Sequence, residues 1–303
     1  MNHLIHSYML LFNQENFAFK MRDKPDIQII RQHLVLSCRM LKSRESENHP
    51  KRRFNMFSKK NIILLLASAT LFVTPVYAAK VYQVATDAAY APFESVNDKK
   101  EIVGFDMDVI KAVALKAGIE VQLHNTPWEG IFATLSSGDR DLVASAVTIT
   151  PERKQSMDFS DPYFEAKQLI AVGKKSNINN FSALKGKKVG VQTGTTGDEI
   201  VQKLLGKTSP NIKRFESTPL AIKELLNGGV DAVVADNGVV INFIANNKSS
   251  SLKTIDDATF AKEFYGFAVK KGNKELLEKL NKGIAAIKAD GTYDKIHKKY
   301  FGN

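Results

Sequence analysis

The sequence predicts an α/β fold divided into two small lobes, and three observations support this prediction. From residue 80 onward, apolar runs of strand length alternate with segments whose apolar residues recur at helical spacing. Such alternation is typical of mostly parallel sheets covered by helices. Apolar residues make up 44% of the 303 residues, which is enough for a packed core. The part of the chain after residue 78 suits two small lobes better than one large sheet.

The expected elements begin with an apolar strand at 80–86 (KVYQVAT). A helix follows over 107–117, where apolar residues recur at helical spacing, and Gly118 ends it. Gly138 stops the next helix in the same way. The other elements expected before residue 150 are a strand at 121–124, the helix at 130–137 and a strand at 141–147.

The alternation continues to the end of the chain. Apolar runs at 169–172 and 188–192 predict buried strands. A pair of glycines, Gly228 and Gly229, closes a helix at 220–226. The remaining expected elements are helices at 198–205 and 239–245, strands at 213–216, 231–235 and 262–269, and two amphipathic, Lys-rich helices at 274–289 and 293–300.

The net charge of +11 is concentrated at the start of the chain. Residues 1–78 hold 12 Lys and Arg against 5 Asp and Glu, whereas residues 79–303 hold 31 against 27. The second part contains no Arg-rich stripe of the kind that binds phosphate backbones. We therefore expect no nucleic-acid partner.

Residues 56–79 (MFSKKNIILLLASATLFVTPVYAA) are typical of a secretory signal peptide. Two lysines precede a largely apolar stretch, Pro75 breaks it, and small residues stand at the positions that a signal peptidase reads before Ala79. The apolar run is shorter than the roughly 20 residues of a membrane span. We expect 56–78 to be removed after Ala78 and the protein to be periplasmic.

Residues 1–55 show no sustained helix or strand period, and we interpret them as upstream sequence with Met56 as the true start. Cys38 is the only cysteine, so no intrachain disulfide can form. It follows no apolar stretch that would make it a lipoprotein cysteine. The mature protein is therefore expected to be soluble rather than lipid-anchored, which favours a Gram-negative periplasm.

Candidate site residues follow the predicted strands directly, because ligands of α/β sheets bind at the carboxyl ends of the strands. Four segments have this placement: 87–94, 145–153, 192–198 and Asp236.

Two of these segments are turns that could accept an anion. In TITPER (148–153), Pro151 suits the first turn of a helix and Arg153 can hold a carboxylate in two hydrogen bonds. In GTTGDE (194–199), amides at the start of a helix could hold a carboxylate or a phosphate. The alternatives are an Arg on a surface turn and an ordinary turn with a capping Thr. The GTTGDE segment lacks the GK[ST] ending of a Walker loop, and the chain has no GxGxxG motif, which argues against nucleotide binding.

Two carboxylates and three aromatic residues complete the candidates. Asp236 and Asp87 each end a strand and could pair with an ammonium group or cap a helix. Tyr90 and Trp128 could enclose a flat or cationic group, or pack in the core. For Phe93 we favour core packing.

Catalytic and metal-binding signatures are scarce. Four of the six histidines precede the signal peptide, and the other two, His124 and His297, lack metal-ligand spacing. The mature chain has no cysteine nucleophile and no GxSxG or HExxH motif. We expect no catalytic residue, no metal and no cofactor.

Taken together, the segments resemble solute-binding protein family 3, the periplasmic receptors of polar amino-acid ABC transporters. The resemblance covers essentially all of 80–303. The matching motifs are ATDAAYAPFES (85–95), VGFDMDV (103–109), TITPERK (148–154), MDFSDPYF (157–164), LKGKKVGVQTGTT (184–196), GGVDAVVADN (228–237) and DGTYDKIHKKYFG (290–302).

The resemblance implies a two-lobed, type II periplasmic-binding-protein-like fold that closes on its ligand. Two parallel-rich sheets would be joined by a two-strand hinge, with crossings near 165–168 and 263–266. The first lobe would comprise 79–166 plus 265–303, and the second lobe 169–262.

The resemblance also implies roles for the site residues. Arg153 would clamp the α-carboxylate of an amino acid, aided by amides at Thr148 and Thr196. Asp236 would take the α-ammonium, together with the Thr148 hydroxyl and the Ala146 carbonyl. The side-chain pocket would involve Asp87, Tyr90, Trp128, Ser145 and Gln192, with Thr195 in the adjoining GTT turn.

This arrangement looks closest to arginine-binding members, so the implied ligand is a free basic L-amino acid: arginine first, then lysine or ornithine. Cystine and glutamine remain open because Trp128 also occurs in cystine-type receptors. The implied partner is the membrane permease of an ABC importer, and the protein is expected to be a monomer.

The alternative from another class is a periplasmic cyclohexadienyl dehydratase-type enzyme on the same fold. Its acid could be Glu94 or Glu129, although both have a simpler interpretation as surface or hinge-side carboxylates. A sensor ectodomain is disfavoured, since the Lys-rich helices at the end of the chain lead into no apolar run.

Overall fold

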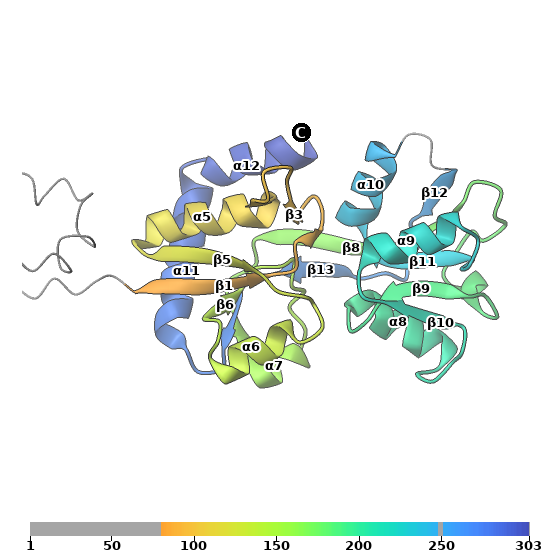
Figure 1. Ribbon diagram of the computed structural model, residues 1–303, viewed down its shortest axis with the longest axis horizontal. Coiled ribbons are helices and arrows are strands. Elements are labelled where there is room, and N and C mark those ends of the chain that lie inside the picture. The colour runs from red at the N-terminus through yellow and green to blue at the C-terminus, as the bar shows by residue number, and fades with distance from the viewer. Residues whose placement is uncertain (1–79, 248–250, 303) are drawn as a thin grey trace, which may run out of the picture. The chain divides into compact units, whose positions relative to one another are not determined.

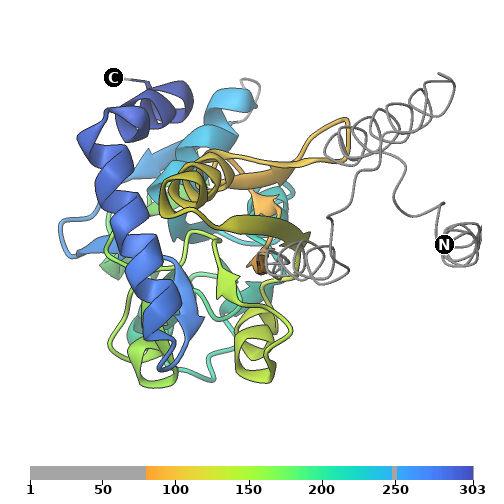
Figure 2. The same ribbon diagram turned by 90° about the vertical axis from the view of Figure 1, so that its left-hand side faces the viewer.

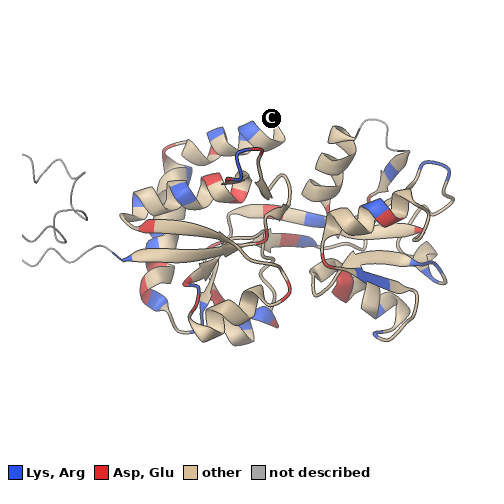
Figure 3. Cartoon of the chain, viewed as in Figure 1, with Lys and Arg blue, Asp and Glu red and all other residues tan. Residues whose placement is uncertain are grey.

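The computed structural model describes residues 80–247 and 251–302. The predicted signal peptide (56–78) and the predicted upstream extension (1–55) lie outside these residues. The described chain contains two α/β lobes, each built around its own sheet (Figure 1). None of the described helices is long and apolar enough to cross a membrane. Lys and Arg are interspersed with Asp and Glu over the elements of both lobes (Figure 3).

The first lobe is built on a mixed five-stranded sheet. Its strands are, in spatial order, β5 (Glu120–Asn125), β1 (Val81–Thr86), β6 (Leu142–Val143), β14 (Ala268–Lys270) and β7 (Met157–Phe159). β1 runs parallel to β5 and β6, whereas β14 is antiparallel to β6 and β7. Val84, Ala85 and Thr86 are fully buried, because helices cover both faces of β1.

Helices α5 (Phe105–Ala117), α11 (Lys274–Ala289) and α12 (Thr292–Phe301) cover one face of this sheet. α6 (Ile131–Ser137) lies on the other face, near the short α7 (Arg153–Ser156) (Figure 1). α11 packs alongside α5 (Figure 2). Their close approach depends on Gly283, where an added Cβ would lie 2.5 Å from the carbonyl oxygen of Val113.

The second lobe is built on another mixed sheet. Its strands are, in spatial order, β10 (Ile212–Phe215), β9 (Val189–Gln192), β11 (Ala232–Asp236), β8 (Phe164–Gly173) and β12 (Leu252–Ile255). One face packs against α8 (Thr196–Leu205) and the 3-10 turn Ser182–Leu184. The other face packs against α9 (Thr218–Leu226) and α10 (Asn237–Asn246).

Strands β8 and β13 (Lys262–Tyr265) form an antiparallel pair between the two sheets. The first part of β8 pairs with β13, and the rest of β8 pairs with β11 and β12 inside the second sheet. The chain therefore enters the second lobe through β8 and leaves it through β13.

Two expected strands differ from the structure. The strand expected at 262–269 is two strands, β13 and β14, because the chain changes partners at Gly266. The Gly266 N–H donates to the carbonyl oxygen of Val147, and a Cβ there would lie 2.8 Å from Cδ1 of Ile149. The strand expected at 141–147 ends at Val143, since Ala146 adopts a left-handed φ of 46° and turns the chain toward the pocket.

A small three-stranded sheet was not expected from the sequence. It consists of β2 (Ala89–Tyr90), β3 (Glu94–Val96) and β4 (Ile102–Val103). Strands of two or three residues are too short to show a period of alternation. This small sheet matters for function because it carries Tyr90 and Glu94.

Candidate ligand-binding site

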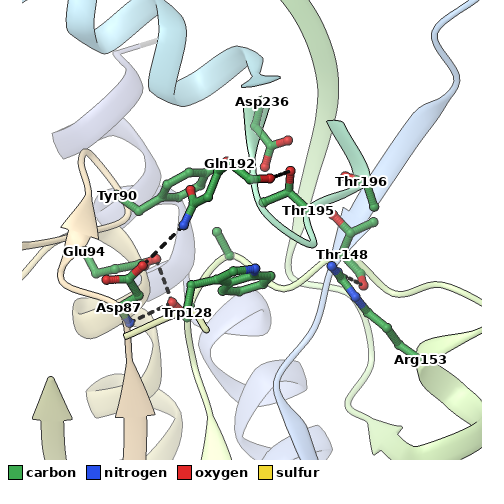
Figure 4. A pocket seen from close by; sticks show the side chains of 12 residues that line it. Asp87, Tyr90, Glu94, Trp128, Thr148, Arg153, Gln192, Thr195, Thr196 and Asp236 are labelled. Carbon is green, nitrogen blue, oxygen red and sulfur yellow. Dashed lines mark hydrogen bonds between the residues drawn. The ribbon is translucent and has the colours of Figure 1, made fainter. Parts of the chain in front are cut away.

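The structure brings all eleven residues predicted for the site to one pocket, whose empty space is about 330 Å³ when the open solvent at its mouth is included (Figure 4). Residues of both lobes line it. The lining consists of Asp87, Tyr90, Trp128, Ser145, Ala146, Thr148, Arg153, Gln192, Thr195, Thr196 and Asp236, together with Glu94. Most lie where a strand ends and the next element begins, as expected for a ligand site of an α/β sheet.

Arg153 forms the cationic side of the pocket. It begins α7 and is buried, with its guanidinium 5.5 Å from the ring of Trp128 and 5.4 Å from that of Phe132. Nη1 donates to the carbonyl oxygen of Thr148 at 2.9 Å, and Nη2 to that of Gly194 at 3.2 Å. Burial lowers its pKa, while the carboxylates of Glu199, Asp236 and Glu263 oppose this. Arg153 therefore lies in the pocket and not on a surface turn.

The turn at 194–196 is held rigidly beside Arg153. Thr195 is the N-cap of α8, and its Oγ1 accepts from the N–H of Asp198 at 3.2 Å. The buried carboxylate of Asp198 in turn accepts from the N–H of Gly194 at 3.1 Å and from Nε of Arg214. The Gly194 N–H therefore already has an acceptor. The Thr196 N–H lies in the first turn of α8, where the helix supplies no acceptor.

Asp236 forms an anionic side of the pocket at the end of β11. Its buried carboxylate accepts hydrogen bonds from the Tyr265 hydroxyl and from Nε2 of Gln168. It occupies the N-cap position of α10, but its side chain makes no capping hydrogen bond. Burial, together with the charge of Glu263, raises its pKa to about 6. Its carboxylate is therefore available to a ligand.

A second acidic region, formed by Asp87 and Glu94, lies across the pocket from Arg153 (Figure 4). The N–H of Asp87 donates to Oγ of Ser145 at 2.9 Å, and that hydroxyl donates to Oε1 of Glu94 at 3.0 Å. Nε2 of Gln192 lies 3.4 Å from Oδ2 of Asp87. Burial raises the pKa of the Asp87 carboxyl, while the Trp128 backbone and Gln192 lower it.

The interpretation of Glu94 as a surface carboxylate was wrong. Its side chain is fully buried and lines the pocket, while Glu129 is exposed. Burial and the charge of Asp106 raise the pKa of Glu94 well above its usual range. Its position at the end of the segment 87–94, after a predicted strand, pointed to the site. The strands of two and three residues around it show no alternation, so the direction of its side chain could not be predicted.

The aromatic residues divide between the pocket and the core. Tyr90 and Trp128 line the pocket. Phe93 is fully buried in the core, as expected, with its ring centroid 5.0 Å from that of Phe164 and 5.3 Å from that of Tyr265.

Glu263 and Gln168 were missed by the sequence analysis. They lie on the paired strands β13 and β8, and Nε2 of Gln168 donates to Oε1 of Glu263 at 3.2 Å. The hydroxyls of Thr148 and Thr196 both donate to the other oxygen, Oε2, at 2.8 Å each. Within the described ranges, no cluster of His, Cys, Asp and Glu could hold a metal ion.

Residues 82–303 match the family model of bacterial extracellular solute-binding proteins, family 3. The chain is 46% identical over 223 residues to a probable histidine-binding protein of Neisseria gonorrhoeae, which covers 73% of this chain and 83% of that relative. It is 36% identical over 248 residues to the ABC transporter arginine-binding protein 1 of Escherichia coli (strain K12), which covers 80% of this chain and 99% of the relative.

A solved structure is also similar to this chain. The arginine-, lysine-, histidine-binding protein ArtJ from the thermophilic bacterium Geobacillus stearothermophilus is 48% identical and superposes with a TM-score of 0.72. The match covers 74% of this chain and 96% of that protein.

Proposed function

Because the chain belongs to family 3 of the bacterial extracellular solute-binding proteins, we propose that it binds a free basic L-amino acid and delivers it to the membrane permease of an ABC importer. Arginine is the first candidate ligand, followed by lysine, ornithine and histidine. The names of the three relatives, which specify histidine, arginine or lysine binding, support this choice. The observation that carries the proposal is the placement of Arg153 opposite Asp87 and Glu94, with Asp236 on a third side (Figure 4).

The α-carboxylate and α-ammonium of an amino acid complement Arg153 and Asp236. In the described residues, only carbonyl oxygens accept from the Arg153 guanidinium, and only uncharged groups donate to Asp236. A buried charge without a counter-ion is costly, so each of these groups favours a ligand that supplies the opposite charge. A zwitterion supplies both. The guanidinium can hold a carboxylate in two parallel hydrogen bonds.

The side chain of a basic amino acid would reach the acidic region at Asp87 and Glu94. Two carboxyl groups there can accept hydrogen bonds from a guanidinium, an ammonium or a protonated imidazole. The rings of Tyr90 and Trp128 line the same pocket and can pack against the aliphatic stem or the planar cation of the ligand side chain. An uncharged side chain would leave these carboxyls without a partner, which disfavours it.

The first test is a thermal-shift screen of the exported protein after bound ligand has been removed by partial unfolding. A ligand that binds only the folded state stabilises it by about 2.7 kcal/mol at a hundredfold excess over its dissociation constant. We expect a rise in melting temperature with basic amino acids. A rise with only glutamine or cystine would contradict the assignment of Asp87 and Glu94 to a basic side chain. Turnover of prephenate would contradict a purely binding role.

We propose that the mature protein is a periplasmic monomer that begins at Ala79. The family description and the signal-peptide pattern of 56–78 support export. N-terminal sequencing of protein from a periplasmic fraction tests the cleavage site, and light scattering tests the oligomeric state. A start within 1–55, or a lasting membrane association, would contradict this assignment.

A further inference from the structure

The strongest feature outside the predicted site is the carboxylate of Glu263. It is half-buried on β13, one of the two strands that pass between the lobes. Its Oε2 accepts from the hydroxyls of Thr148, on the first lobe, and Thr196, on the second, each at 2.8 Å. Both hydroxyls belong to residues that line the pocket, although Glu263 does not line it.

These hydrogen bonds decide which way the two hydroxyls point. A threonine hydroxyl has one hydrogen to donate and two lone pairs that accept. Oε2 of Glu263 accepts from both, so it takes the single hydrogen of the Thr148 hydroxyl and that of the Thr196 hydroxyl. Oγ1 of Thr196 already accepts from Nε2 of Gln168 at 3.1 Å and keeps one lone pair, whereas no described residue donates to Oγ1 of Thr148. Each oxygen can therefore still accept a hydrogen bond from a group inside the pocket.

Glu263 also orients the amide of Gln168. Nε2 of Gln168 lies between Oε1 of Glu263, at 3.2 Å, and Oδ1 of Asp236. Two carboxylates on that side require the amide nitrogen there, since an amide oxygen would face two acceptors. Oε1 of Gln168 accepts no hydrogen bond from any described residue. The position of Asp236 is thus linked to Glu263 through one side chain.

We propose that Glu263 is a positioning residue that makes the hydroxyl oxygens of Thr148 and Thr196 face the pocket beside Asp236 as acceptors, so that this subsite is selective for the α-ammonium of the ligand. This rests on the proposed function, since it specifies how the same pocket recognises one end of an amino acid. An ammonium group donates and cannot accept, so it is complementary to a carboxylate and two threonine oxygens that each keep at least one free lone pair. Hydrogen bonds to charged groups are stronger than those between neutral groups.

The test compares two ligands that differ only at the α-carbon. Arginine carries the α-ammonium, and 5-guanidinopentanoate has the same guanidinium, stem and carboxylate without it. In Glu263→Gln we expect the dissociation constant for arginine to rise about tenfold or more, whereas that for 5-guanidinopentanoate changes by less than about twofold. Equal losses for both ligands, or no loss for either, would overturn the proposal.

Three further variants guard against indirect effects. Thr148→Val removes one hydroxyl at nearly constant shape and should show the same selective loss. In the Thr148→Val background, Glu263→Gln should weaken arginine binding less than it does in the wild type, because both substitutions act through the Thr148 hydroxyl. Glu165→Gln is the matched control: it changes the same charge on the adjacent strand β8, where Glu165 is exposed and pairs with Lys262. It should leave both affinities unchanged.

The wild-type protein separates this inference from the proposed function. If it binds no basic amino acid, the proposed function fails. The comparison is then made with the amino acid that does bind and its α-deamino analogue. If the wild type binds arginine and Glu263→Gln shows no preference between the two ligands, only the role of Glu263 fails.

Discussion

Arg153 and Gly194 contact each other from different lobes, with Nη2 of Arg153 donating to the carbonyl oxygen of Gly194 at 3.2 Å. A second contact joins the lobes across the pocket, where Nε2 of Gln192 lies 3.4 Å from Oδ2 of Asp87. The residues that would bind a ligand are therefore the residues that join the lobes. A ligand carboxylate would compete with the Gly194 carbonyl for the same guanidinium, so binding and lobe contact are coupled through Arg153.

Asp87→Asn should weaken arginine binding by about tenfold or more, since it removes one of the two carboxylates available to a guanidinium. The side chain is partly exposed and burial raises its pKa, so the loss of its charge should leave the melting temperature of the ligand-free protein nearly unchanged. Calorimetric titration with arginine measures the first effect. Asp98→Asn, an exposed carboxylate outside the pocket lining, is the control. An unchanged affinity in Asp87→Asn would refute a basic ligand held at this residue.

The affinity for an amino acid should fall as the pH drops below about 6. The pKa of Asp236 is raised to about 6 by burial and by Glu263, and Tyr265, Tyr90 and Gln168 face the same carboxylate. A proton and the α-ammonium compete for the ionised form of Asp236, so the dissociation constant should rise about tenfold for each pH unit below that value. Titrations between pH 4.5 and 8 check this. Asp236→Asn should bind more weakly and lose the inflection.

Asp106→Asn should make the stability of the ligand-free protein less sensitive to pH between about 4 and 7. Burial raises the pKa of Asp106 to about 7, although the Tyr163 hydroxyl and the Ala146 N–H donate to it at 2.6 and 2.7 Å. An unfolded Asp has a pKa near 3.9. The folded protein therefore binds this proton more tightly, and the resulting stability is lost as the pH rises through about 7.

The asparagine oxygen can keep both hydrogen bonds while the charge beside Glu94 disappears. The melting temperature of the wild type should thus fall as the pH rises from about 4 to about 7 and level off above that, and that of Asp106→Asn should fall less over the same range. Parallel slopes for the two proteins would argue against a titrating Asp106.

Gly238→Ala should weaken ligand binding through the contact between the lobes. Gly238 is on α10 of the second lobe, and an added Cβ would lie 2.7 Å from Cζ of Phe93 on the first. The Phe93 ring cannot move aside easily, because it is fully buried against Phe164, Tyr265 and Phe301. We expect about a tenfold loss of affinity, with the secondary structure unchanged by circular dichroism.

Phe93→Leu is the partner variant for this prediction. Leucine is shorter, so Gly238→Ala should cost much less affinity in the Phe93→Leu background than in the wild type. If the two losses simply add, the contact between these residues does not limit binding.

The repeating strands and helices made most of the fold predictable, and the α/β type II periplasmic-binding-protein fold is confirmed by the family match and the solved relative. Periodic strands such as β9 and β11 show where they end, and the rule that ligands bind at those ends led to Gln192 and Asp236. The roles of these residues toward a ligand remain a proposal.

The missed residues lie where the pattern carries no period. Glu94 begins the three-residue strand β3, which pairs with the two-residue strand β2, and strands this short show no alternation that would predict its burial and its contact with Ser145. Glu263 fell inside one long expected strand, and its direction depends on the break at Gly266. Packing around that glycine, which no local pattern reveals, decides where the carboxylate points.

Strand β14 lies between β6 and β7 in the first sheet, although the whole second lobe separates it from them in the sequence. The second lobe is one continuous segment and can fold as soon as it emerges. The first lobe must wait for residues near the C-terminus, and such distant pairing is slow. A chain that crosses a membrane from its N-terminus therefore keeps β1, β5 and β6 without their full sheet until the crossing is nearly complete. For the export proposed above, the order of the strands delays completion of the first lobe until most of the chain has crossed.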